Sequence, residues 1–167
     1  HDIVTNTMSI LILGTVALDT VKTPQGLREH MLGGSAVHFS MSARIFNSVH
    51  LVAVVGKDFP QQHIKFLKSK HIDLSCLIQS DGETFRWSGA YEGDLNSALT
   101  LDTKLGVLST FTPKVCSFQR GIKHVFLANV DPEIQMRLLK EMKSAQFIGL
   151  DSMNYWINTK RQMLLKL

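Results

Sequence analysis

Two adjacent glycines, Gly33 and Gly34, stand directly before a run with a helical pattern, Ser35 to Phe46. Paired glycines at such a place have two explanations. Glycine adopts positive φ without strain and can turn the chain into the helix. Because it has no side chain, glycine also lets a ligand approach the free N–H groups of the first helical turn. The dipeptide alone favours the turn, since glycine is common in loops, and leaves the ligand open.

The elements expected around these glycines alternate between strand and helix. Continuous apolar runs of strand length, typical of strands buried on both faces of a parallel sheet, lie at 9–14, 49–56, 124–130 and 147–151. Helical patterns lie between them at 35–46, 60–69 and 132–143, the last behind a possible cap at Asp131. This alternation predicts the α/β class, with a mainly parallel sheet between two layers of helices.

The segment Glu83 to Phe111 interrupts this alternation. Two sets of side chains alternate at its start, Phe85, Trp87, Gly89 and Tyr91 against Thr84, Arg86, Ser88 and Ala90. Such a pattern is typical of a two-faced antiparallel strand, and together with an earlier segment it predicts a small separate sheet. Four strands are few for the main sheet, and a final helical pattern runs to Leu167 without a stop signal, so the fold is expected to be incomplete.

Composition excludes several classes of function. Lys and Arg number 18 against 14 Asp and Glu, but they are scattered and form no stripe for nucleic acid. No apolar run approaches the length of a membrane span, and His1 to Thr7 lack the features of a signal peptide, so they are interpreted as a leader or vector remnant before Met8. Cys76 and Cys116 indicate neither a zinc site nor a disulfide framework, which favours reduced thiols in a cytoplasmic protein.

In their order along the chain, these motifs resemble the amino-terminal half of the PfkB, or ribokinase-like, carbohydrate kinases. A first strand ends at Gly14 with Asp19 close behind, and GGSAVHFSMSAR follows a lid segment. VAVVGKDFPQQHIKFLKSKHID then resembles the next stretch of the family. The resemblance implies that residues 1–167 are the amino-terminal part of one ribokinase-like domain, with β-lid segments at about 16–33 and 83–111.

The resemblance also implies a reaction, the transfer of phosphate from ATP, with Mg²⁺, to a hydroxyl of a sugar or nucleoside. Asp19 stands where such kinases hold substrate hydroxyls, and a carboxylate can accept two vicinal hydroxyls. Gly33 and Gly34 would let the sugar lie against the helix start. Where pentose kinases commonly have two asparagines, this chain has Ala17 and His38. His38 is either a polar ligand or an ordinary helix histidine, and ribose is not assumed.

Two further candidates lie elsewhere in the resemblance. Arg86 and Trp87 should lie on opposite faces of one lid strand, so one of them points into the cleft; Arg86 suits a phosphate or carboxylate, whereas Trp87 suits a packed face or an interface. We expect Arg86 to face the cleft over Gly33 and Gly34. Asn129 follows a core strand, where α/β sheets bind ligands.

The family's catalytic aspartate belongs to a Gly-Ala-Gly-Asp motif that is absent from these 167 residues. The chain is therefore interpreted as the substrate half of a truncated kinase, inactive alone, without a catalytic residue, a metal site, or ATP and Mg²⁺ of its own. The alternative is a non-catalytic module that binds a ligand or dimerises. In either case exposed lid edges favour a homodimer through the β lid.

Overall fold

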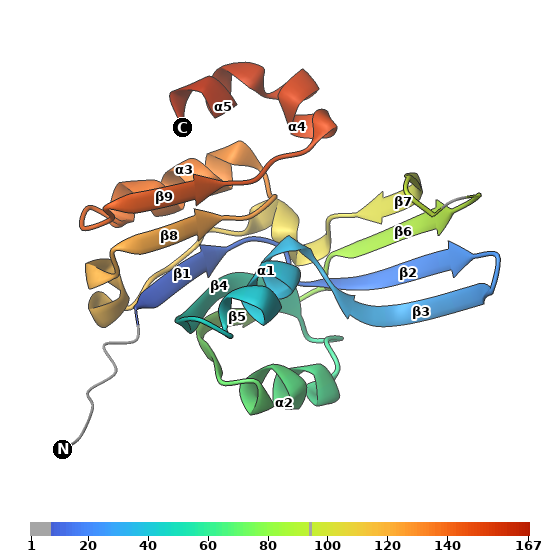
Figure 1. Ribbon diagram of the computed structural model, residues 1–167, viewed down its shortest axis with the longest axis horizontal. Coiled ribbons are helices and arrows are strands. Elements are labelled where there is room, and N and C mark those ends of the chain that lie inside the picture. The colour runs from blue at the N-terminus through green and yellow to red at the C-terminus, as the bar shows by residue number, and fades with distance from the viewer. Residues whose placement is uncertain (1–7, 94) are drawn as a thin grey trace.

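The main sheet of the computed structural model has five parallel strands in the order β5-β4-β1-β8-β9 (Figure 1). The structure describes residues 8–93 and 95–167. The strands of this sheet are β1 (Ser9–Leu13), β4 (Ser48–Gly56), β5 (Ile72–Ser80), β8 (His124–Leu127) and β9 (Phe147–Leu150). The central strands are apolar on both faces because helices or helical turns cover both.

Alternate side chains of these strands enter two hydrophobic clusters. Leu11, Leu13, Val52 and Val54 pack on one face against η1 (Gly106–Thr110) and α3 (Pro132–Glu141). Ile12, Leu51, Ala53 and Val55 pack on the other against α1 (Ser35–Ala43) and α2 (Gln61–Ser69). The alternation along each strand therefore builds three layers, helix, sheet and helix, as the sequence predicts.

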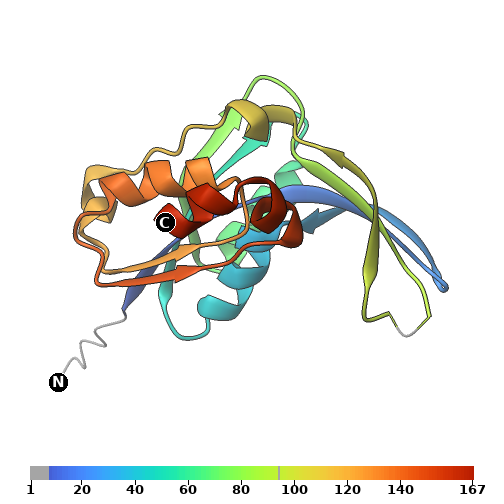
Figure 2. The same ribbon diagram turned by 90° about the horizontal axis from the view of Figure 1, so that it is seen from above.

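A second sheet projects from one end of the main sheet (Figures 1 and 2). Its strands are β2 (Ala17–Thr23), β3 (Gly26–Gly33), β6 (Arg86–Tyr91) and β7 (Ala98–Lys104), in the order β3-β2-β6-β7. The pairs β2–β3 and β6–β7 are antiparallel, whereas β2 and β6 are parallel. The chain enters this sheet twice, directly after β1 and again after β5.

The predicted α/β class, with a mainly parallel sheet and a small second sheet, is confirmed. Two details of the prediction are wrong. The main sheet has a fifth strand, β5, and the strand in 84–91 is antiparallel only to β7, because its other neighbour, β2, runs in the same direction.

The helices also differ in their ends. The first helix ends at Ala43 rather than Phe46, because Ile45 and Phe46 close tighter turns onto Ser42 and Ala43. The last helical pattern, 158–167, is interrupted at Lys160, whose φ of −129° is not helical; α4 (Asn154–Thr159) ends before Lys160 and α5 (Arg161–Lys166) follows it. Outside the undescribed residues 1–7 and 94, no helix has the length and apolar character needed to cross a bilayer.

Candidate functional site

Gly34 occupies a backbone conformation that only glycine adopts readily. It is the N-cap of α1, with φ of +99° and ψ of 148°. A Cβ at Gly34 would overlap the backbone oxygen of Thr15, and a Cβ at Gly33 would overlap the carboxylate of Asp19. The turn explanation of the glycine pair therefore holds at Gly34, while the space that a Cβ at Gly33 would take is occupied by the Asp19 carboxylate.

Three loops meet at the start of α1. Thr15, which follows β1, accepts a hydrogen bond from the Ser35 N–H at its Oγ1 (2.9 Å) and one from the Ala36 N–H at its carbonyl oxygen (3.1 Å). The Ser35 hydroxyl in turn donates to the backbone oxygen of Asn129, which follows β8 (2.8 Å). Thr15 thus takes the place of a side-chain cap at the helix start, and these bonds hold the glycine turn and Asn129 together.

The Asp19 carboxylate is partly buried against this turn. Burial raises the pKa of the Asp19 carboxyl, although the charge of His38 and a hydrogen bond from the Gly34 N–H act in the opposite direction. Among the described residues, Asp19 Oδ1 is one of the few buried side-chain oxygens without a hydrogen-bond partner. A buried acceptor of this kind is costly unless a donor reaches it.

Asn129 presents a second oxygen of the same kind. Its Nδ2 lies 3.2 Å from Met153 Sδ, while its Oδ1 is buried and has no partner in the part of the chain that the structure describes. Because its backbone oxygen is bound to Ser35, the residue next to Gly34, Asn129 is fixed near the glycine turn. The structure therefore brings three of the sequence-predicted site residues, Asp19, Gly33 and Gly34, into direct contact, and Ser35 links Asn129 to them.

Arg86 lies on the other face of the second sheet. Asp19 pairs with Trp87 and with Met31 across the strands, whereas Arg86 pairs with Leu18, and paired residues share a face. The expectation that Arg86 faces the glycine cleft is therefore wrong. Trp87 shares the face of Asp19, where its ring covers Gly89 and its Nε1 donates to Thr100 Oγ1 (3.1 Å).

One other side chain of this segment, that of Phe85, lies apart from the predicted arrangement. Phe85 does not join Trp87 in a common aromatic face, because it precedes β6 and packs against the main-sheet cluster of η1 and α3. A register shift between β6 and β7 leaves Leu101 of β7 without a partner, while β6 itself stays in regular register with β2 from Arg86 to Ala90.

His38 contributes to a different hollow. It is exposed on α1 and lines an apolar groove of about 410 Å³ with Leu32, Val37, Met41, His63 and Phe66. Asp19 does not line this groove, so the two side chains share no pocket. The effect of His38 on Asp19 is electrostatic, since its charge acts to lower the pKa of the Asp19 carboxyl.

No protein-family model matches this chain. A cytidine kinase of Thermococcus kodakarensis is 28% identical over 138 residues, which cover 81% of this chain and 49% of the kinase. The solved nucleoside kinase of Methanocaldococcus jannaschii, an archaeal member of the ribokinase family, superposes with a TM-score of 0.75 at 20% identity, covering 96% of this chain and 57% of that one. This chain has the ribokinase-like fold.

A second solved structure agrees with this assignment. The nucleoside kinase of Burkholderia thailandensis, in complex with inosine, gives a TM-score of 0.72 at 16% identity and is covered over 56% of its length by 94% of this chain. The resemblance to the amino-terminal half of ribokinase-like kinases is thereby confirmed. The chain spans about half the length of the relatives that it matches.

In this ribokinase-like fold, Asp58 joins the second sheet to the main one. It lies in the loop after β4 and accepts hydrogen bonds from the N–H and the Oγ1 of Thr84 (both 2.7 Å) and from Arg86 Nη2 (2.7 Å). Burial opposes ionisation of Asp58, but these bonds and the charge of Arg86 outweigh it and lower the pKa of the carboxyl. Sequence reasoning missed this contact, since nothing in the sequence pairs residues 28 positions apart.

Proposed function

We propose that this chain forms the substrate-binding half of an ATP-dependent kinase that phosphorylates a hydroxyl of a nucleoside or sugar. One observation carries the proposal: the partly buried Asp19 carboxylate lies on Gly33 and keeps one oxygen unpaired beside the start of α1. An ionised carboxylate with a free oxygen is a strong acceptor for hydroxyl donors.

Each residue has a defined role in this proposal. Asp19 accepts the hydroxyl groups of the substrate, and Gly33 and Gly34 leave room for the substrate ring. Asn129 accepts a further hydroxyl at its free Oδ1, while His38 adds positive charge or a donor from α1. Arg86, which the sequence analysis assigned to the substrate, is omitted, since its guanidinium is bound to Asp58 on the opposite face.

A nucleoside is favoured over a free sugar. The matched relatives include a cytidine kinase and two solved nucleoside kinases, one of them in complex with inosine. Trp87 adds a physical reason, because it lies on the face of Asp19 and an aromatic ring gives a base an apolar surface for stacking.

We also propose that residues 1–167 are the amino-terminal part of one domain, with the two segments that build the second sheet, 16–33 and 83–111, forming its lid.

ATP and Mg²⁺ would act in the complete enzyme. Within residues 8–93 and 95–167, no group of three or more His, Cys, Asp or Glu side chains is suited to hold a metal ion. Because its sequence has no Gly-Ala-Gly-Asp, we expect this chain alone to transfer no phosphate. The cytoplasmic location stays a prediction.

Binding by the 167-residue protein tests this proposal. Calorimetric titration with cytidine, inosine, ribose and fructose should show saturable binding of at least one nucleoside, and Asp19→Asn should weaken it at least tenfold. Asp81→Asn is the matched control, since Asp81 is 86% exposed and pairs with Lys57 at the surface. Equal binding by wild type and Asp19→Asn, or none by wild type, would contradict the proposal.

A second role, dimerisation through the second sheet, is favoured by one specific feature. Leu99 and Leu101 are 60% and 55% exposed on β7, an edge strand of that sheet. Unpaired edges with apolar side chains readily pair with a second copy. Sedimentation equilibrium should show a homodimer that Leu101→Lys dissociates, whereas a wild-type monomer at every concentration would refute it.

A further inference from the structure

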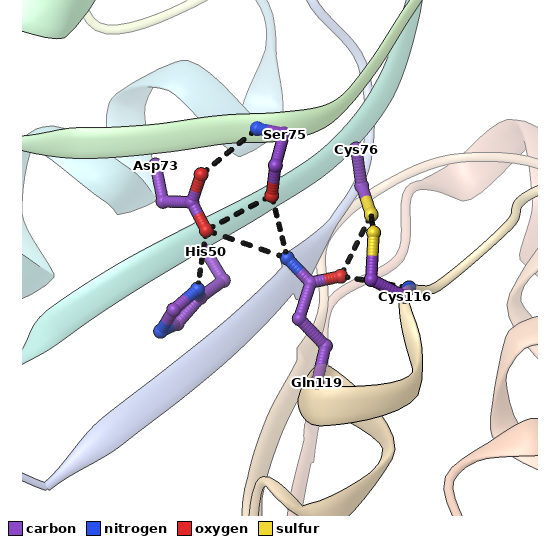
Figure 3. A network of polar contacts seen from close by, with 6 residues as sticks. All are labelled: His50, Asp73, Ser75, Cys76, Cys116 and Gln119. Carbon is purple, nitrogen blue, oxygen red and sulfur yellow. Dashed lines mark hydrogen bonds and ion pairs between the residues drawn. The ribbon is translucent and has the colours of Figure 1, made fainter.

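The two cysteines lie in contact although 40 residues separate them in sequence. Cys76 is on β5 and Cys116 directly precedes η2 (Ser117–Gly121), and their sulfur atoms are 3.4 Å apart (Figure 3). Both thiols are free. A disulfide needs about 2.05 Å between the sulfurs, so the two atoms must approach each other by about 1.4 Å for the bond to form.

We propose that Cys76 and Cys116 are a site of reversible oxidation, at which a disulfide joins β5 to η2. The two thiols differ in a way that gives each a role. Cys76 is 5% exposed, whereas Cys116 is partly exposed to solvent. Burial, with hydrogen bonding to Cys116, raises the pKa of the Cys76 thiol to about 11, so Cys76 is the slower nucleophile.

The oxidant is a low-molecular-weight disulfide such as oxidised glutathione. The Cys116 thiolate attacks one sulfur of this disulfide, forms a mixed disulfide and releases one thiolate. Cys76 then loses its proton to solvent and attacks the sulfur of Cys116, which displaces the second thiolate. The protein loses two protons and two electrons, and one glutathione disulfide becomes two thiols.

The surroundings of the cysteines suit both states. Gln119, which is fully buried, accepts hydrogen bonds at its Oε1 from the Cys76 thiol (2.7 Å) and from the Cys116 N–H (3.2 Å). Its Nε2 donates to Ser75 Oγ (3.2 Å), which in turn donates to Asp73 (Figure 3). When oxidation removes the thiol proton, Oε1 keeps the backbone donor of Cys116, so no buried acceptor is left unpaired.

The proposed disulfide has a consequence for the second sheet. The segment between Cys76 and Cys116 contains both β6 and β7, so the bond would close a loop around this hairpin and fix its two ends to the main sheet. Cross-linking residues 40 positions apart restricts the unfolded chain strongly. Oxidation should therefore raise the melting temperature by roughly 10 °C.

Oxidation of the native protein with glutathione buffers tests this inference. After exposure to oxidised glutathione without denaturant, mass spectrometry should show a protein lighter by two hydrogen atoms, with no thiol open to alkylation. Dithiothreitol should restore both thiols and the lower melting temperature. The inference is overturned if the thiols stay free, if only intermolecular or mixed disulfides form, or if oxidation leaves the melting temperature unchanged.

Two variants separate the roles of the cysteines. Cys76→Ser should trap the first step, since Cys116 then stays in a mixed disulfide with glutathione. Cys116→Ser should leave Cys76 largely unmodified because of its burial. The melting temperature of each variant should be the same with and without oxidant. Faster reaction of Cys76 than of Cys116 with oxidised glutathione would refute the assigned order.

Discussion

Replacing Gly34 by alanine tests why the helix α1 begins with paired glycines. The backbone at Gly34 has φ of +99°, which L side chains rarely adopt, and the new Cβ would overlap the Thr15 carbonyl oxygen. That oxygen already accepts a hydrogen bond from Ala36, so it cannot move away without loss. The variant must either strain its backbone or displace the loop after β1.

The size of the effect follows from these two terms. A residue held in a sparsely populated backbone region costs about 1–3 kcal/mol. Relieving an overlap inside a packed region costs about 1–3 kcal/mol more. The sum, about 4 kcal/mol, corresponds to a fall in melting temperature of roughly 8–16 °C for a chain of this size.

Gly26→Ala is the matched control. Gly26 also has positive φ, +140°, but no atom of the described residues lies within 4 Å of the Cβ that it would gain. Gly26→Ala should therefore be destabilised only by its unfavourable backbone conformation, which is about half of the effect expected for Gly34→Ala. Chemical denaturation of both variants, monitored by circular dichroism, measures the difference. Equal losses of stability in Gly34→Ala and Gly26→Ala would show that the contact with Thr15 does not explain the need for glycine at position 34.

Three further predictions concern individual polar side chains. Asp19→Asn should have a higher melting temperature than wild type at pH 7. Because the pKa of Asp19 is raised in the folded state, its contribution to stability is lost as the pH rises and the carboxyl ionises. The difference in melting temperature should close below pH 3.8. Asp58→Asn should have a lower melting temperature than wild type at pH 7. Because the pKa of Asp58 is lowered, its stabilising contribution is complete above pH 3.8 and is lost as the pH falls through the lowered folded-state pKa, so the difference should narrow in acid. Gln135→Ala should cost about 3 kcal/mol in denaturation experiments, because the two N–H groups of its buried Nε2 are shared among three backbone oxygens within hydrogen-bond distance. Exposed Gln146→Ala should cost little.

The main sheet could be predicted because its signal is local. The run 49–56 is apolar except for His50, a pattern typical of a strand buried on both faces. β5 was not predicted, because its residues mix apolar and polar types, as expected of an edge strand. Its side chains range from buried Ile72 to exposed Ser75, so the strand has no continuous apolar run.

The faces of the second sheet could not be predicted in the same way. Which side of a strand meets a site depends on pairing with strands far away in sequence, and one shift of register reverses every side chain. Arg86 shows the consequence. The alternation correctly separated it from Trp87, but only the pairing of Asp19 with Trp87 shows which of the two shares the face of the site.

The two explanations of the glycine pair are connected in the structure. The positive φ of Gly34 turns the chain so that its N–H donates to the Asp19 carboxylate, and the absence of a side chain at Gly33 leaves the space that this carboxylate occupies. A turn that required glycine for purely mechanical reasons would not need a partly buried acid beside it, since burial of that acid costs stability. An acid that raises the free energy of the folded chain, with one oxygen unpaired, is the pattern expected of a binding residue rather than a structural one.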